Sequence, residues 1–114
     1  MLPQKNRLRK EKDFRRVLKE GQSIRASGLA LKFLKNRASF PRFGIVVSKS
    51  IDKRAVKRNY IKRFITETIR KELHAPLLGM DAVIITQKGI EKMTAPEIKK
   101  TLTSTLNKAG LFKK

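Results

Sequence analysis

The segment KRAVKRNYIKRF, residues 53–64, carries six basic side chains in twelve positions and no acidic one. A disordered basic tail needs no regular apolar spacing, but apolar residues recur here and just beyond at helical intervals. On a wheel of about 100° per residue, one half-circle contains Tyr60, Ile61, Phe64, Ile65, Thr68 and Ile69. The opposite side contains Asn59, Lys62, Arg63, Thr66 and Arg70. The pattern predicts a helix over about 53–73 that buries one face and turns a cationic face outward.

The sequence on either side of this helix predicts a sheet. Upstream, LALKFL (29–34) and RFGIVVSK (42–49) are β-prone runs separated by turn-prone residues, and they predict an antiparallel pair. A further short strand is expected near Ser23 to Ala26. Downstream, the continuous apolar run of DAVIITQK (81–88) is typical of a strand covered on both faces. The strands that flank the basic helix are expected to be parallel neighbours joined by a β-α-β crossover, right-handed by default.

Two other segments have helical patterns. KDFRRVLKEG predicts a short helix over about 12–20 with Gly21 at its end, and its apolar residues are Phe14, Val17 and Leu18. TAPE begins another helix, in which Thr94 and Glu97 have the spacing of a capping box. The buried stripe of that helix and the glycine that ends it are Ile98, Leu102, Leu106 and Gly110.

These elements have the order α-β-β-(β)-α-β-α, where the strand in brackets is the additional short one. A length of 114 residues suits one compact domain. We therefore expect a single small α+β domain over residues 1–114, with a mixed sheet. Residues 1–10 are expected to be an extended or flexible lead-in.

The charge of the chain indicates a polyanionic partner. Lysine and arginine number 29 against nine acidic residues, a net charge of +20, and no acid between 53 and 63 could pair with the basic helix. Phosphates would relieve this repulsion by releasing counterions. No dimerisation heptad or helix-turn-helix pair is visible, so a folded RNA fits better than DNA. No apolar run approaches a membrane span, cysteine is absent, and the N-terminus lacks a secretion signal; we expect a cytoplasmic protein.

Few residues could carry catalysis within the chain. His74, the only histidine, is expected to be an exposed residue at a helix end. The aspartates Asp13, Asp52 and Asp81 lie at predicted element edges, where capping and turn roles account for them. No carboxylate cluster or glycine-rich phosphate loop is visible, so a self-sufficient nuclease is not favoured. Among the phenylalanines, Phe64 is expected in the core, whereas Phe14 could stack on a base.

The basic segment, preceded by RFGIVVSKSI, resembles the arginine-asparagine-arginine signature region of the bacterial ribonuclease P protein subunit. Similar matches are KNRLRKEKDFRRVLKEG near the N-terminus, DAVIITQKG in the last strand and LNKAGLFKK at the end. The signature positions that match are Lys53, Ala55, Val56, Arg58, Asn59, Lys62 and Arg63. Tyr60 and Thr66 depart from it, because the family usually has arginine at the first position and often at the second.

The resemblance implies a left-handed crossover in place of the default. It also implies a single copy of the chain bound to a catalytic RNA, with which it removes the 5′ leader of precursor tRNA. Mg²⁺ would belong to the RNA, and the protein itself would need no cofactor. Expected contacts with the catalytic RNA are Lys53, Arg54, Lys57, Arg58, Asn59, Tyr60, Lys62, Arg63 and Arg70. A cleft between the first helix and the sheet would receive the leader, at Phe14, Arg15, Leu18 and Lys32.

Two alternatives share the size and charge of the chain. A small basic structural protein that binds ribosomal RNA would have no effect on tRNA processing. A nucleoid or DNA-binding protein would need a dimer or a groove-reading element, and the sequence contains neither pattern.

Overall fold

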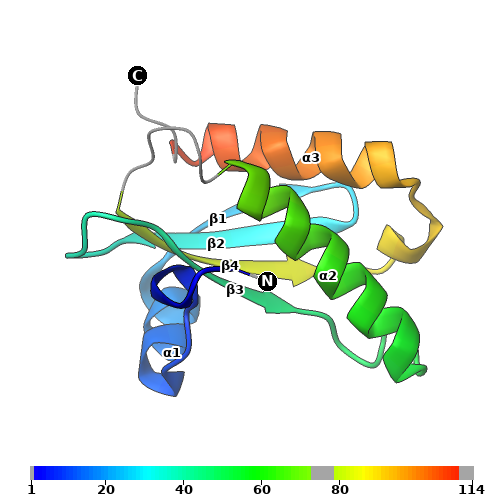
Figure 1. Cartoon of the computed structure of the whole chain (residues 1–114), viewed down its shortest axis with the longest axis horizontal. Coiled ribbons are helices and arrows are strands. Elements are labelled where there is room, and N and C mark those ends of the chain that lie inside the picture. The colour runs from blue at the N-terminus through cyan, green and yellow to red at the C-terminus, as the bar shows by residue number, and fades with distance from the viewer. Residues whose placement is uncertain (1, 73–78, 111–114) are drawn as a thin grey trace.

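The computed structural model describes residues 2–72 and 79–110 of the chain (Figure 1). Its elements are η1 (Gln4–Asn6), α1 (Glu11–Glu20), β1 (Gln22–Ala26), β2 (Leu29–Lys35), β3 (Arg42–Val46), α2 (Ala55–Glu72), β4 (Met80–Thr86), η2 (Ile90–Lys92) and α3 (Ala95–Lys108). The predicted α+β order is confirmed, and the additional strand is β1. The prediction for His74 lies outside the described residues.

The four strands form one mixed sheet in the order β1-β2-β4-β3. β4 pairs antiparallel with β2 and parallel with β3, and Ala82 lies opposite Phe33 on one side and Phe43 on the other. The predicted antiparallel pairing of β2 with β3 is therefore wrong. β4 lies between them because its almost continuous apolar run is buried on both faces, and this requires the centre of the sheet.

The parallel neighbours β3 and β4 are joined through α2, as predicted. In Figure 1, α2 lies in front of the sheet, both strands point to the right, and β4 lies above β3. This path is left-handed, so the default expectation is wrong and the expectation from the resemblance is confirmed. A right-handed path would put α2 on the other face of the sheet, where α1 packs.

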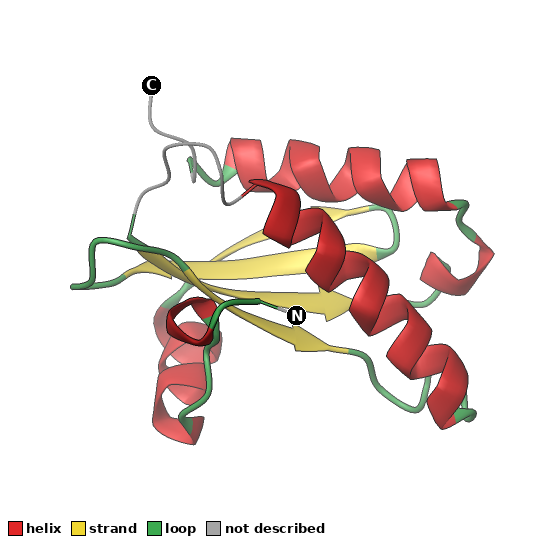
Figure 2. Ribbon diagram, in the orientation of Figure 1, coloured by secondary structure: helices red, strands yellow, loops and turns green. Residues whose placement is uncertain are grey.

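The helices cover the two faces of the sheet unequally (Figure 2). α2 and α3 share one face, where the fully buried Ile65, Ile69, Leu102 and Leu106 pack on the strands. On the other face, α1 and the N-terminal segment cover part of the sheet through a small cluster of Val17, Leu8 and Val83. Because α1 is only ten residues long, it leaves part of this second face open.

The lead-in is extended after η1 but is fixed to the molecule. Leu2, Asn6 and Leu8 are buried. The Asn6 side-chain amide donates a hydrogen bond to the Pro41 carbonyl at 2.7 Å, and the Leu8 N–H donates to the Phe43 carbonyl at 2.8 Å. The N-terminal segment thus pairs briefly with the outer edge of β3.

Local signals at the ends of two helices are confirmed. Thr94 and Glu97 form both hydrogen bonds of a capping box. The hydrogen bonds that the Glu97 carboxylate accepts from the Thr94 backbone N–H and hydroxyl lower the pKa of Glu97. Gly110 follows α3 with a φ of 78°, a conformation that favours glycine. Gly21 ends α1 for another reason: a Cβ there would lie 2.4 Å from the Val17 carbonyl oxygen.

Candidate nucleic-acid interface

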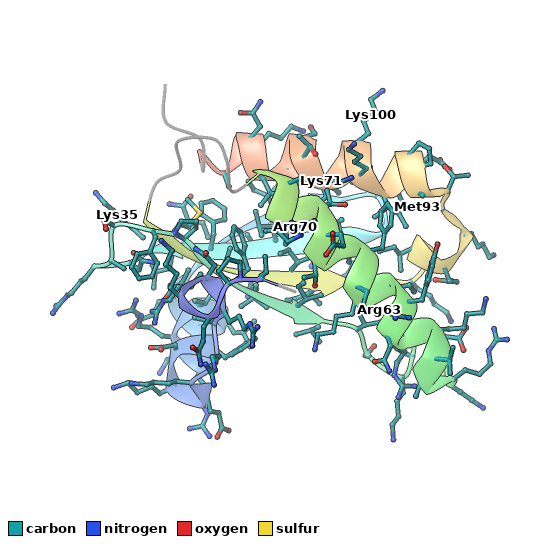
Figure 3. All side chains as sticks on the ribbon, viewed as in Figure 1. Lys35, Arg63, Arg70, Lys71, Met93 and Lys100 are labelled. Atoms are coloured by element: carbon teal, nitrogen blue, oxygen red, sulfur yellow. The ribbon has the colours of Figure 1, made fainter. Side chains whose placement is uncertain are left out.

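The outer side of α2 is a cationic surface. Ile61, Ile65 and Ile69 are buried against the sheet, whereas Asn59, Lys62, Arg63 and Arg70 are exposed, as the helical wheel predicted. Figure 3 shows Arg63 and Arg70 along the length of this helix. Within the described part of the chain, Lys62 and Arg63 have no acidic partner. We call these exposed residues, with the basic residues at the start of α2, the cationic face.

Tyr60 departs from the predicted pattern. Its side chain is 59% exposed, although the helical wheel placed it with the buried residues. The first turns of α2 extend beyond the ends of the strands (Figure 1), and Val56 in the same region is 75% exposed. The sheet therefore ends before Tyr60 can be covered, and its hydroxyl is available to a partner.

Asp52 organises the start of the cationic face. Its carboxylate accepts hydrogen bonds from the Arg54 backbone N–H at 2.9 Å and from the Arg54 guanidinium at 3.0 and 3.1 Å. These bonds, with the side chain of Arg54 contributing most, lower the pKa of Asp52 to about 2. Arg58 donates to the carbonyls of Asp52 and Lys53 at 3.0 and 2.9 Å. The turn role predicted for Asp52 is confirmed, and both arginines have intramolecular partners.

The far end of the cationic face is partly neutralised. Arg70 and Glu67 form an ion pair at 2.9 Å, and the hydrogen bonds from Arg70 lower the pKa of Glu67. Thr66 donates its hydroxyl to the Lys62 carbonyl at 2.7 Å. Its side chain is therefore engaged with its own helix. Among the described residues, Lys62 and Arg63 in the middle of the face are without an ion pair, as are Lys53 and Lys57 near its start.

A groove of about 380 Å³ lies beside the cationic face. α2 contributes Lys62 and Thr66 to it, and the other linings come from β3, α1 and the N-terminal segment: Leu2, Arg7, Leu8, Arg9, Phe14, Phe43, Gly44 and Ile45. Lys62 and Thr66 also line a shallow depression on the outer side of α2, with Asn59 and Arg63. The groove and the cationic face therefore adjoin.

One wall of the groove is the outer edge of β3. Backbone groups of a strand point alternately to its two edges. Because the Phe43 carbonyl bonds to Leu8 at this edge, the N–H and C=O of Ile45 point the same way. The groove thus combines an aromatic ring, an apolar floor, backbone polar groups and cationic rims.

The four residues predicted for the leader cleft lie at different places. Phe14 is half-buried and lines the groove. Leu18, one turn further along α1, is 40% exposed, and Lys32 donates to its carbonyl at 2.9 Å. Arg15 is exposed and pairs with Glu11 at 2.6 Å. Phe14 alone of the four belongs to the groove lining, and Leu18 and Lys32 lie together on the partly open face beside α1.

A buried ionic network fixes α1 on the sheet. Asp81 is fully buried and accepts two hydrogen bonds from Arg42, both at 2.7 Å, and one from Asn36 at 2.9 Å. The hydrogen bond to Asp81 is the main cause of a raised pKa at Arg42. From α1, Arg16 lies 3.7 Å from Asp81, and Asp13 lies 3.5 Å from Arg42.

The sequence interpretation missed this network. The assignment of Asp81 to a capping or turn role is wrong, because its carboxylate lies inside the sheet beside Arg42 on the paired strand. The Asp13 carboxylate contacts Arg42 as well. The sequence did contain a signal for this pair: each of the two strands predicted to be parallel neighbours begins with a charged residue, and a buried charge needs a partner.

The described residues contain neither a metal-binding cluster nor a membrane-spanning helix. No group of three or more histidine, cysteine or acidic side chains is arranged to hold a metal ion. In the same part of the chain, no helix combines the length and the apolar character needed to cross a membrane.

The fold and the cationic face define a small α+β RNA-binding protein. A family model described as Ribonuclease P matches residues 2–110. The ribonuclease P protein components of Clostridium botulinum (strain Loch Maree) and Dictyoglomus turgidum are 36% and 37% identical to this chain. The alignments cover 94% and 98% of this chain, and 96% and 95% of the relatives. The chain belongs to the ribonuclease P protein family, whose members act in tRNA processing.

Solved structures agree with this assignment. The RNase P protein of Staphylococcus aureus superposes with a TM-score of 0.86 at 32% identity, over 95% of this chain and 98% of that one. The RNase P protein of Thermotoga maritima gives 0.81 at 30% identity, over 90% and 96%. The match therefore includes the whole arrangement of helices and sheet on which the cationic face and the groove depend.

Proposed function

We propose that this chain is the RNA-binding subunit of ribonuclease P, which acts with a catalytic RNA to remove the 5′ leader from precursor tRNA. Membership of the family supports the overall activity. The observation that carries the detailed proposal is that Lys62 and Thr66 line both the groove and the shallow depression within the outer side of α2, where the cationic face lies. One RNA assembly can therefore contact both surfaces at once.

The cationic face binds the catalytic RNA. Lys62 and Arg63 are exposed cations without an acidic partner in the described part of the chain, and phosphates would supply the missing charge. Lys53, Arg54, Lys57, Arg58, Asn59 and Arg70 extend the same contact. Tyr60 takes part through its exposed hydroxyl, whereas the bond from Thr66 to its own helix leaves it a poor substitute for arginine.

The groove and the open sheet face beside α1 bind the single-stranded leader. An apolar floor with an aromatic ring suits an unstacked base better than a phosphate, and Arg9 and Lys62 lie where the backbone phosphates of such a strand would pass. Leu18 and Lys32 continue the path along the open face, with Arg15 at its outer side. This recognition depends little on sequence, as processing of many precursors requires.

The chemistry belongs to the RNA and its Mg²⁺ ions, with one copy of this chain in each complex. Two carboxylates on elements that border the groove are already engaged: Asp13 lies beside Arg42, and Glu67 pairs with Arg70. A carboxylate that is already held by an arginine is not free to act as a general base. The protein acts by binding the substrate and by stabilising the active RNA.

The proposal is tested by cleavage of precursor tRNA by the cognate catalytic RNA at low Mg²⁺, with and without this chain. We expect the chain to increase cleavage strongly at low Mg²⁺ and much less at high Mg²⁺, where the cation screens the RNA alone. Unchanged cleavage together with tight binding to ribosomal RNA would contradict the proposal and favour a structural ribosomal protein.

A further inference from the structure

Gly44 and Phe14 meet in the wall of the groove. Gly44 is a buried residue within β3, and its φ lies outside the left-handed region, so the backbone there would accept any residue. A Cβ added to it would lie 2.3 Å from Cζ of Phe14, 2.6 Å from Cε1 and 3.3 Å from Cε2. All three nearest atoms belong to the Phe14 ring. A side chain at position 44 would therefore occupy the space that this ring now fills.

We propose that Gly44 is a positioning residue that seats the Phe14 ring for stacking on a leader nucleotide. This inference rests on the proposed role of the groove in leader binding. Without a side chain at 44, the end of the ring rests against the strand backbone and forms part of the groove wall. With a side chain there, the ring would be displaced toward the groove and would occupy space that a base needs.

Packing of the core gives no reason for this pairing. Glycine weakens the interior of a strand, because it loses more conformational freedom and has no side chain to pack. A larger residue at 44 with a smaller one at 14 would fill the same volume without that loss. The chain instead combines the smallest residue with a ring that is packed on Leu8, Val17 and Val83 and is still partly exposed. This arrangement holds the exposed part of the Phe14 ring in one position in the wall of the groove.

The contact also predicts how the site would fail. The atoms nearest to the added Cβ are at the far end of a flexible side chain, so Phe14 would rotate away before the sheet had to shift. Gly44→Ala should therefore keep the fold and change the groove. In a Phe14→Ala background the obstacle is absent, and the same substitution should be silent.

The test is a double-mutant cycle with Gly44→Ala, Phe14→Ala and both together, each assembled with the catalytic RNA. The measured quantity is the ratio of the affinities for precursor and mature tRNA. We expect Phe14→Ala to lower this ratio roughly 5- to 150-fold, the range for one base stacked on one ring. Gly44→Ala should lower it several-fold, and the double variant should be no worse than Phe14→Ala.

Each other result overturns the inference in an identifiable way. Equal losses from Gly44→Ala in both backgrounds would mean that Gly44 acts independently of the ring. A normal ratio for Gly44→Ala beside a low ratio for Phe14→Ala would remove the positioning role and leave the leader groove intact. A normal ratio for Phe14→Ala would overturn both the inference and the leader-binding role of the groove.

A structural readout completes the experiment. In the unmodified protein, NMR cross-peaks are expected between the Hα protons of Gly44 and the ring protons of Phe14, and their absence would contradict the contact. If Gly44→Ala alone does not fold, the double variant must still give a cooperative melting curve, because the obstructing ring has been removed. Failure of the double variant to fold would overturn the inference.

Discussion

α1 and α2 are both basic amphipathic helices on the same sheet, yet their charges are used differently. On α1, Asp13 and Arg16 point to oppositely charged groups of the sheet, Arg42 and the buried Asp81. On α2, the middle turns carry cations without carboxylates, and Glu67 appears only near the end. Charges that have partners within the chain hold an element in place, and charges that lack them are available to phosphates. The position of the acidic residues therefore distinguishes an anchoring helix from a binding helix.

The largest effect should come from breaking the anchor of α1. Asp81→Asn leaves the guanidinium of Arg42 without its main counter-charge in a partly buried site, and such a loss costs about 3–5 kcal/mol of unfolding free energy. Chemical denaturation of both proteins measures it. The control is Glu11→Gln, which breaks the exposed ion pair with Arg15 on α1 and should cost no more than about 1 kcal/mol. Equal effects would show that burial of the pair is unimportant.

The next effect concerns the binding helix. Arg63→Ala should weaken binding of the catalytic RNA by about 1.5–3 kcal/mol, because it removes a charge-assisted contact. It should also reduce the slope of log affinity against log salt by about one. Arg63 is a cleaner site for this test than Arg58, which also supports the turn before α2. Binding is measured by titration at several salt concentrations.

Lys71→Ala is the matched control for Arg63→Ala. Lys71 is exposed in the last turns of α2, close to α3 in Figure 3, and lies away from the groove. Its loss should change the affinity less. Equal losses at the two positions would indicate that the RNA responds to total charge and that this particular face is not recognised.

These tests depend on features that the sequence could predict to different degrees. The helix of α2 and the capping box at Thr94 depend on residues three or four apart, so local spacing was sufficient. The central position of β4 and the contact of Arg42 with Asp81, 39 residues apart, depend on tertiary packing that periodicity does not encode. The prediction for Tyr60 was wrong for the same reason. A helical wheel gives the side of the helix on which a residue lies, but not where the sheet that covers that side ends.

A smaller effect should follow from changing that misplaced residue. Tyr60→Arg adds a guanidinium at an exposed position on the edge of the cationic face. We expect tighter binding to the catalytic RNA by about 0.5–1.5 kcal/mol at low salt, decreasing as salt is added. Tyr60→Phe separates the role of the hydroxyl and should weaken binding slightly. Unchanged affinity for Tyr60→Arg would place this position outside the RNA contact.

The smallest effect is local and concerns pH at the start of α2. The pKa of Asp52 is lowered from 3.8 to about 2, so its contribution to stability is present above pH 3.8 and is lost as the pH falls through about 2. Below that value the carboxyl group is protonated, the Arg54 hydrogen bonds weaken, and the first turn of α2 should fray while the sheet persists. An NMR titration should show the Asp52 carboxyl carbon and the Arg54 amide changing together with a midpoint near pH 2. Asp52→Asn should abolish the change at Arg54. A midpoint near 3.8 would mean that Arg54 does not hold this turn, and that the cationic face begins without a fixed cap.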